Sequence, residues 1–204
     1  GKTMPLYPFL SQFNDVLVPG SMGEETLLLD ATNPHRPMGM LPLRALNDSG
    51  YLLHEDNAQW VQIPRNVMRQ HMFFAQGTLR PNGTVDANVR ATYSGASIAS
   101  HRSEYAQADD DTSFVKEAVF DHYDDAEISD PTIEIPDVRS EAITVDAGVT
   151  LPGYARTAAD FIYLNPVLLG RWGENPFQRP ERTYPVDFGY PIQIQQTLSL
   201  QVWE

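Results

Sequence analysis

The sequence contains no cysteine. A disulfide framework, a thiolate metal site and a thiol nucleophile are therefore excluded for this chain. Because cysteine usage is the feature that reports on the redox compartment, this criterion leaves the compartment open.

Basic residues are also scarce. The chain has 14 Lys and Arg residues against 27 Asp and Glu residues, which gives a formal net charge of -13. Such a chain repels phosphate backbones and anionic lipids, and no cluster of Lys and Arg offsets this charge locally. We therefore expect neither nucleic-acid binding nor membrane binding.

Long apolar runs are missing as well. The longest runs, residues 27–29 and 167–169, fall far short of the roughly 20 residues that span a bilayer. The chain has no charged-then-apolar leader, but Gly1 ahead of Lys2 resembles a residue left by a purification tag. We therefore expect that the chain is cut from a longer protein and that any signal peptide lies upstream.

What remains is an ordinary globular composition. The 204 residues are 42% hydrophobic and 20% charged, which is enough to bury one good core or two small ones. Residues 1–64 hold short strand-like runs broken by proline, glycine and asparagine, and the stretch 35–57 within them predicts a loop. We see no internal repeat and no low-complexity tract.

The clearest local pattern is a hairpin formed by residues 67–79 and 84–93. The second run has an apolar residue at every other position, which places these residues on one face of a strand: Val85, Ala87, Val89, Ala91 and Tyr93. Pro81, Asn82 and Gly83 between the runs supply the backbone angles of a tight turn. Alternation returns at the end of the chain, where Ile192 to Val202 carry apolar residues on one face and glutamines and serine on the other.

One segment between the predicted strands has apolar residues at clear helical spacing. Residues 112–123 follow an acidic stretch that can cap the free amides of a helix start, and residues 96–107 favour a second helix. Together the patterns predict a mainly β chain, an antiparallel β-sandwich over residues 65–204 with one or two inserted helices, the clearest near 112–123.

Several segments resemble bacterial transglutaminase-like proteins, which have a papain-like fold. Residues 9–18, 27–34 and 41–47 are similar to the back half of the core of that family, and residues 175–190 are similar to a signature of the β-sandwich domain of unknown function that follows the core. The resemblance implies that residues 1–64 are a short β segment left over from a transglutaminase-like core. It also implies an exported protein, periplasmic or extracellular.

The resemblance further implies where a catalytic triad would lie. In that fold a cysteine thiol attacks an amide, a histidine takes its proton and an aspartate orients the histidine. By resemblance Asp30 stands at the aspartate position, Asp15 stands at the histidine position, and the cysteine position lies upstream of Gly1. Because a carboxylate repels a thiolate rather than stabilising it, we expect no active catalytic residue in this chain.

Other candidate sites are weaker. His35 lies in a turn-rich loop, and His54, His71, His101 and His122 share no ligand spacing, so no metal and no cofactor are expected. The acidic residues around 109–111 and 121–125 lack the pattern of a calcium loop and are better explained as helix caps and a solvated face. The exposed loop with Arg171 and Trp172, together with Tyr184, is the best candidate for a ligand-binding surface.

Three functional hypotheses follow. The first is a non-catalytic structural or interaction module of an exported transglutaminase-like protein, whose first partner is the remainder of its own parent chain. The second is the accessory half of an active cysteine transamidase or peptidase with an upstream cysteine. The third is a glycan-binding β-sandwich that uses Trp172. Protein partners and self-association through unpaired strand edges stay open, and a β-rich fold by itself cannot choose among these functions.

Overall fold

The computed structural model describes most of the chain. The described residues are 9–23, 25–46, 49–63, 67–136, 142–171, 175, 178, 181, 183, 186, 188 and 190–202. Their elements are mainly strands, and two α-helices lie between them.

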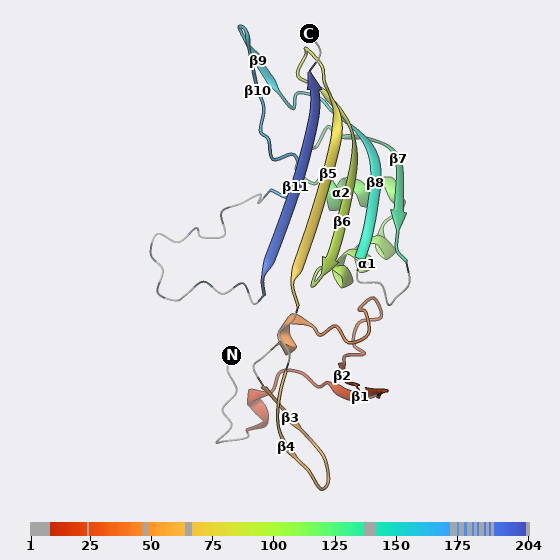
Figure 1. Cartoon of the computed structure of the whole chain (residues 1–204), viewed down its shortest axis with the longest axis vertical. Helices are drawn as coiled ribbons and strands as arrows, with labels where there is room; N and C mark the ends of the chain where they lie inside the picture. The colour runs from red at the N-terminus through yellow and green to blue at the C-terminus, as the bar shows by residue number, and fades with distance from the viewer. Residues whose placement is uncertain are drawn as a thin grey trace.

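A five-stranded mixed sheet forms the body of the molecule (Figure 1). Its strands, in spatial order, are β11 (Ile192–Val202), β5 (Arg69–Leu79), β6 (Val85–Gly95), β8 (Ala142–Leu151) and β7 (Glu127–Glu134). Neighbouring strands run antiparallel, except that β11 pairs with β5 in parallel. The mainly β class expected from the alternating runs is confirmed.

The hairpin expected from residues 67–93 is present as β5 and β6. Arg80 and Thr84 close the turn through a hydrogen bond from the Arg80 amide to the Thr84 carbonyl (2.8 Å), and Gly83 adopts a φ of 83° that favours glycine. Alternation on β6 points Val85, Ala87 and the other apolar residues inward. The inner face of the sheet therefore carries most of the core, in which each fully buried large side chain contributes roughly 1.5–3 kcal/mol.

The two helices, α1 (Ile98–Gln107) and α2 (Asp111–Val119), cover this inner face (Figure 1). They confirm both helices expected near 96–107 and 112–123. The acidic stretch acts as anticipated, since Asp110 caps α2 and forms a reciprocal capping box with Ser113. Phe114 and Val115 of α2 and Ile98 of α1 are almost fully buried against the sheet. The layer opposite the large sheet is thus helical, while the outer face of the sheet stays open to solvent.

The N-terminal part lies beyond one end of the large sheet and consists of two small hairpins (Figure 1). One pairs β1 (Val18–Met22) with β2 (Glu25–Leu29), and the other pairs β3 (Ser49–Leu52) with β4 (Gln59–Gln62). Two short 3₁₀ helices, η1 (Leu10–Gln12) and η2 (Leu43–Ala45), accompany them.

The expectation that residues 35–57 form only a loop was wrong, because η2 and β3 lie inside this stretch. Strand β3 exists through its pairing with β4, in which Tyr51 lies opposite Trp60 and the two rings meet edge to face at 5.2 Å. A composition rich in proline, glycine and asparagine does not favour a strand, so the sequence did not indicate β3. The stability of β3 comes from its pairing with β4.

A third small hairpin, β9 (Arg156–Ala158) with β10 (Phe161–Tyr163), extends from the body near the end of β8 (Figure 1). No helix among the described residues is long and apolar enough to cross a membrane.

Candidate functional site

Asp15 and Asp30, the two acids that the resemblance assigns to triad positions, lie close together, on either side of one arginine. Asp15 precedes β1 and Asp30 follows β2, so the hairpin returns the chain and brings the two positions together. Arg44, the middle residue of η2, places its Nε 2.8 Å from Asp15 Oδ2 and one Nη 3.9 Å from Asp30 Oδ2. A second guanidinium, that of Arg36, forms an ion pair with Asp30.

Asp30 is the more enclosed of the two acids, because only 1% of its side chain is exposed. Burial by itself would raise the pKa of Asp30, but hydrogen bonds from the Thr32 hydroxyl and amide, both 3.0 Å, and the charges of Arg36 and Arg44 hold it below the ordinary value. The Asp30 carboxylate is therefore charged at neutral pH and is occupied by structural partners. It has no histidine to orient among these contacts.

The predicted ligand-binding surface is described only in part. Trp172 and Tyr184 lie outside the described residues. Arg171 is described, and its guanidinium lies over the Tyr123 ring at 5.5 Å and donates to the His122 carbonyl at 3.4 Å. Arg171 thus has partners on the segment after α2.

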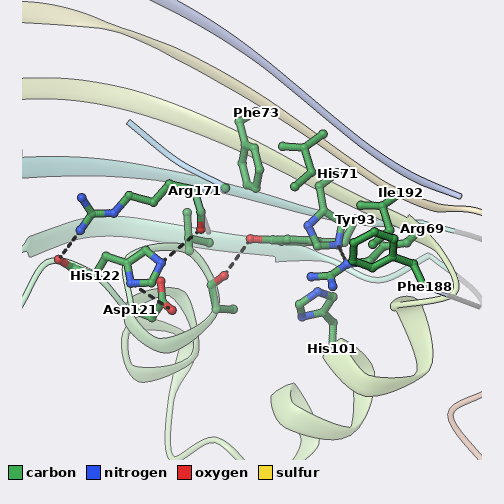
Figure 2. Close-up of a pocket in the computed structure, with 14 residues that line it drawn as sticks. Arg69, His71, Phe73, Tyr93, His101, Asp121, His122, Arg171, Phe188 and Ile192 are labelled. Carbon is green, nitrogen blue, oxygen red and sulfur yellow. Dashed lines mark hydrogen bonds and ion pairs between the residues drawn. The ribbon is translucent and has the colours of Figure 1, made fainter. Parts of the chain in front are cut away.

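A partly open cavity of about 450 Å³, which sequence reasoning did not find, lies between the five-stranded sheet and the helical layer (Figure 2). Its volume lies in the range of small-molecule sites, roughly 300–1,000 Å³. It is lined by Arg69, His71, Phe73, Tyr93, His101, Ala118, Val119, Asp121, His122, Gly170, Arg171, Phe188, Ile192 and Ile194.

At one end of this cavity Arg69 and His71 project from the start of β5. Arg69 Nε donates to His71 Nε2 at 3.1 Å, and the hydroxyl of Ser97 lies 3.0 Å from the same ring nitrogen. Since a guanidinium can only donate, His71 Nε2 accepts and Nδ1 carries the ring proton. His71 is therefore held as a neutral imidazole.

His101 of α1 approaches the same place from the helical layer. Its ring lies 5.7 Å from the His71 ring and 4.1 Å from the Tyr93 ring, measured between centroids. Its Nδ1 is 3.0 Å from a Glu104 carboxylate oxygen, while its Nε2 is buried and has no hydrogen-bond partner within the described part of the chain. Burial lowers the pKa of His101, and the charge of Arg69 lowers it further, against the opposing effect of Glu104.

Ser97 and His71 are hydrogen-bonded, but they are not suited to act as a catalytic nucleophile and its general base. Burial first, and then the charges of Arg69 and His101, lower the pKa of His71 to about 3. A general base works best when its pKa lies near the operating pH, so an imidazole with a pKa of about 3 takes a serine proton poorly. Tyr93 is equally inert, because burial raises the pKa of its phenol and its hydroxyl donates to the Ala118 carbonyl at 2.9 Å. The arrangement suits binding better than proton transfer.

Sequence reasoning missed this cluster because it looked for histidines at ligand spacing along the chain. His71 and His101 are brought together by β5 and α1, which are separated by all of β6. One signal was available: the strand period that places Phe73 inward also places His71 inward, and an inward histidine needs a partner.

Among the described residues, no group of three or more His, Asp or Glu side chains is placed to hold a metal ion. Comparison of the chain with protein-family models, with curated proteins and with solved structures finds no match.

Proposed function

We propose that this chain is a non-catalytic interaction module of an exported transglutaminase-like protein. The observation that carries the proposal is the pairing of Asp15 and Asp30 with arginines at the two triad-equivalent positions that the chain contains. A catalytic carboxylate in this fold must orient a histidine, whereas Asp30 is enclosed by Arg36, Arg44 and Thr32.

The absence of any cysteine supports the same proposal, because the chain cannot itself supply the thiol. The neutral state of His71 adds to it, since an imidazole with a pKa of about 3 is a poor base for the neighbouring Ser97 hydroxyl. These features favour holding a partner over cleaving or transferring an amide.

The first experiment asks whether the purified chain acts on amides. Its substrates are a glutamine-containing peptide, for ammonia release, and casein with a fluorescent amine, for cross-linking, with an active transglutaminase as the positive control. We expect no rate above that of heat-treated protein. Reproducible hydrolysis or amine incorporation by the chain would contradict the proposal.

The second experiment separates an interaction module from the accessory half of an enzyme. The chain is mixed with the cysteine-bearing core segment that the accessory-half alternative requires, and both binding and amide hydrolysis are measured. We expect the two pieces to co-elute without hydrolytic activity. Hydrolysis that requires both pieces would favour the accessory-half alternative instead.

A further inference from the structure

The cavity described above has two chemically different ends (Figure 2). At one end Asp121, His122 and Arg171 gather near the end of α2, and Arg171 is held there by Tyr123 and the His122 carbonyl. At the other end lie Arg69 and His101. A charged ligand would therefore have a defined direction in the cavity.

The charge of Arg69 is the main feature of its end. Within the part of the chain that the structure describes, no carboxylate forms an ion pair with Arg69, and the side-chain contact of its guanidinium is the bond from Nε to His71. A guanidinium carries five N–H donors, so its two Nη groups remain for another acceptor. The half-buried Arg69 guanidinium lies beside the imidazole rings of His71 and His101, which offer it no negative charge. An anion that enters the cavity would therefore stabilise this cation.

His101 supplies a second group for the same anion. Because the Glu104 carboxylate only accepts, His101 Nδ1 holds the ring proton and the buried Nε2 is an acceptor while the ring is neutral. An anion beside Nε2 favours protonation there, which converts this unsatisfied atom into a donor. Binding of an anion should therefore be accompanied by uptake of a proton at His101 Nε2.

The walls between the two ends are apolar. Phe73 of β5 and Ile192 and Ile194 of β11 line one side, while Ala118 and Val119 of α2 and Phe188 complete the lining. Figure 2 shows Phe188 and Ile192 beside Arg69, and Phe73 farther along the cavity. Such walls favour a ligand with an apolar body over inorganic phosphate or a metal ion, and the Arg69 charge repels a cation.

We propose that this cavity binds a small organic carboxylate, with its anionic group at Arg69 and His101 and its apolar body along Phe73 and Ile194. The carboxylate points away from Asp121, which lies at the opposite end of the cavity (Figure 2). Two planar Arg69 donors match the two carboxylate oxygens. This site does not depend on the transglutaminase resemblance and stands or falls separately from it.

The test uses 3-phenylpropionate as the probe and 3-phenylpropan-1-ol, which has the same body without the charge, as its counterpart. Binding to the full chain is measured by isothermal titration calorimetry at pH 6. We expect the acid to bind at least about tenfold more tightly than the alcohol, as a charge-assisted hydrogen bond implies. Equal affinities, or no binding of the acid at millimolar concentration, would overturn the proposal.

Arg69→Gln should reduce the affinity for the acid by about tenfold or more and leave the affinity for the alcohol unchanged. The matched control is Arg90→Gln on the neighbouring strand β6, where Arg90 pairs with Asp146 on the outer face of the sheet. This control should bind the acid as the parent chain does. The Arg69→Lys variant keeps the positive charge, so its affinity for the acid should lie between those of Arg69→Gln and the parent chain. This variant also serves as the test if Arg69→Gln fails to fold. Loss of affinity in the Arg90 variant alone would sink the proposal.

The pH dependence tests the role of His101. The charged and titratable groups that face its ring are Arg69 and His71 on β5, Tyr93 on β6 and Glu104 on its own helix. We expect the affinity for the acid to rise as the pH falls from 8 to 6, with proton uptake visible as a dependence of the heat on the buffer. His101→Gln should abolish this pH dependence. An unchanged pH profile in that variant would remove His101 from the site.

N-acetylphenylalanine, which resembles a peptide C-terminus, is the second probe. Tighter binding than 3-phenylpropionate would assign the carboxylate to the end of a peptide, and weaker binding would assign it to a free organic acid. Both outcomes support recognition of a carboxylate at Arg69.

Discussion

At the scale of single residues, we expect the stability of the N-terminal part to depend on the ion pair between Asp30 and Arg36. The exposed fractions of the Arg36 and Asp30 side chains are 11% and 1%, so their ion pair is largely removed from water. We predict that Asp30→Asn lowers the free energy of unfolding of this part by about 3 kcal/mol, because it leaves the Arg36 guanidinium buried without its counter-charge. Urea denaturation followed by tryptophan fluorescence measures the change, since Trp60 lies in this part.

The matched control for this prediction is Asp146→Asn. Asp146 also pairs with an arginine, Arg90, at 2.7 Å, but the exposed fractions of the two side chains are 63% for Arg90 and 41% for Asp146. Exposed pairs contribute about 0–1 kcal/mol, so this variant should unfold almost as the parent chain does. Equal losses in both variants would show that burial does not set the strength of the Asp30 pair.

At the scale of elements, the junction between β6 and α1 depends on a glycine. Gly95 ends β6 with a φ of 69°, and a Cβ built there would lie 1.7 Å from the Met68 carbonyl oxygen, which accepts from the Ala96 amide at 3.0 Å. We predict that Gly95→Ala destabilises the chain by about 3 kcal/mol, because it combines left-handed strain with displacement of the chain before β5. Thermal unfolding followed by circular dichroism measures this loss.

Gly153→Ala separates the two causes. Gly153 has a similar φ of 65°, but a Cβ there meets nothing within 4 Å. This variant should lose only the strain of a left-handed alanine, about 1 kcal/mol. If Gly153→Ala cost as much as Gly95→Ala, the close approach to Met68 would be irrelevant.

At the scale of the whole molecule, folding keeps His71 uncharged and so makes stability depend on pH. The pKa of His71 is about 3 in the folded chain, mainly because of burial, against 6.5 when exposed. Below pH 6.5 the unfolded chain therefore binds a proton that the folded chain does not, and stability falls as the pH drops from 6.5 toward 3. Each pH unit in this window favours unfolding by about tenfold through this group.

Urea denaturation at pH 7 and pH 5 tests this expectation. In the His71→Gln variant the loss of stability between the two pH values should be smaller than in the parent chain, even though the variant is less stable at both. His54→Gln, in the exposed loop between β3 and β4, should show the pH dependence of the parent chain. A His71→Gln variant with an unchanged pH dependence would refute the assignment.

Local patterns foresaw the elements whose causes are local. Period-two alternation marked β6, and the acidic residues before α2 marked its start, where Asp110 caps the helix. They failed for β3, because that strand is held by its partner β4 rather than by its own composition. They also did not indicate that β11 runs parallel to β5, with Gln70 and Gln193 side by side although 123 residues apart.

The sequence by itself determined the mainly β class, the two helices, the hairpin of β5 and β6 and the exclusion of thiol chemistry, because turn residues, caps, periodicity and composition act at short range. Only the tertiary structure decided that Arg44 lies between Asp15 and Asp30, and that Arg69 and His101 line the same end of one cavity. Those groups come from elements far apart in the chain, and their meeting depends on how a sheet and its helices pack.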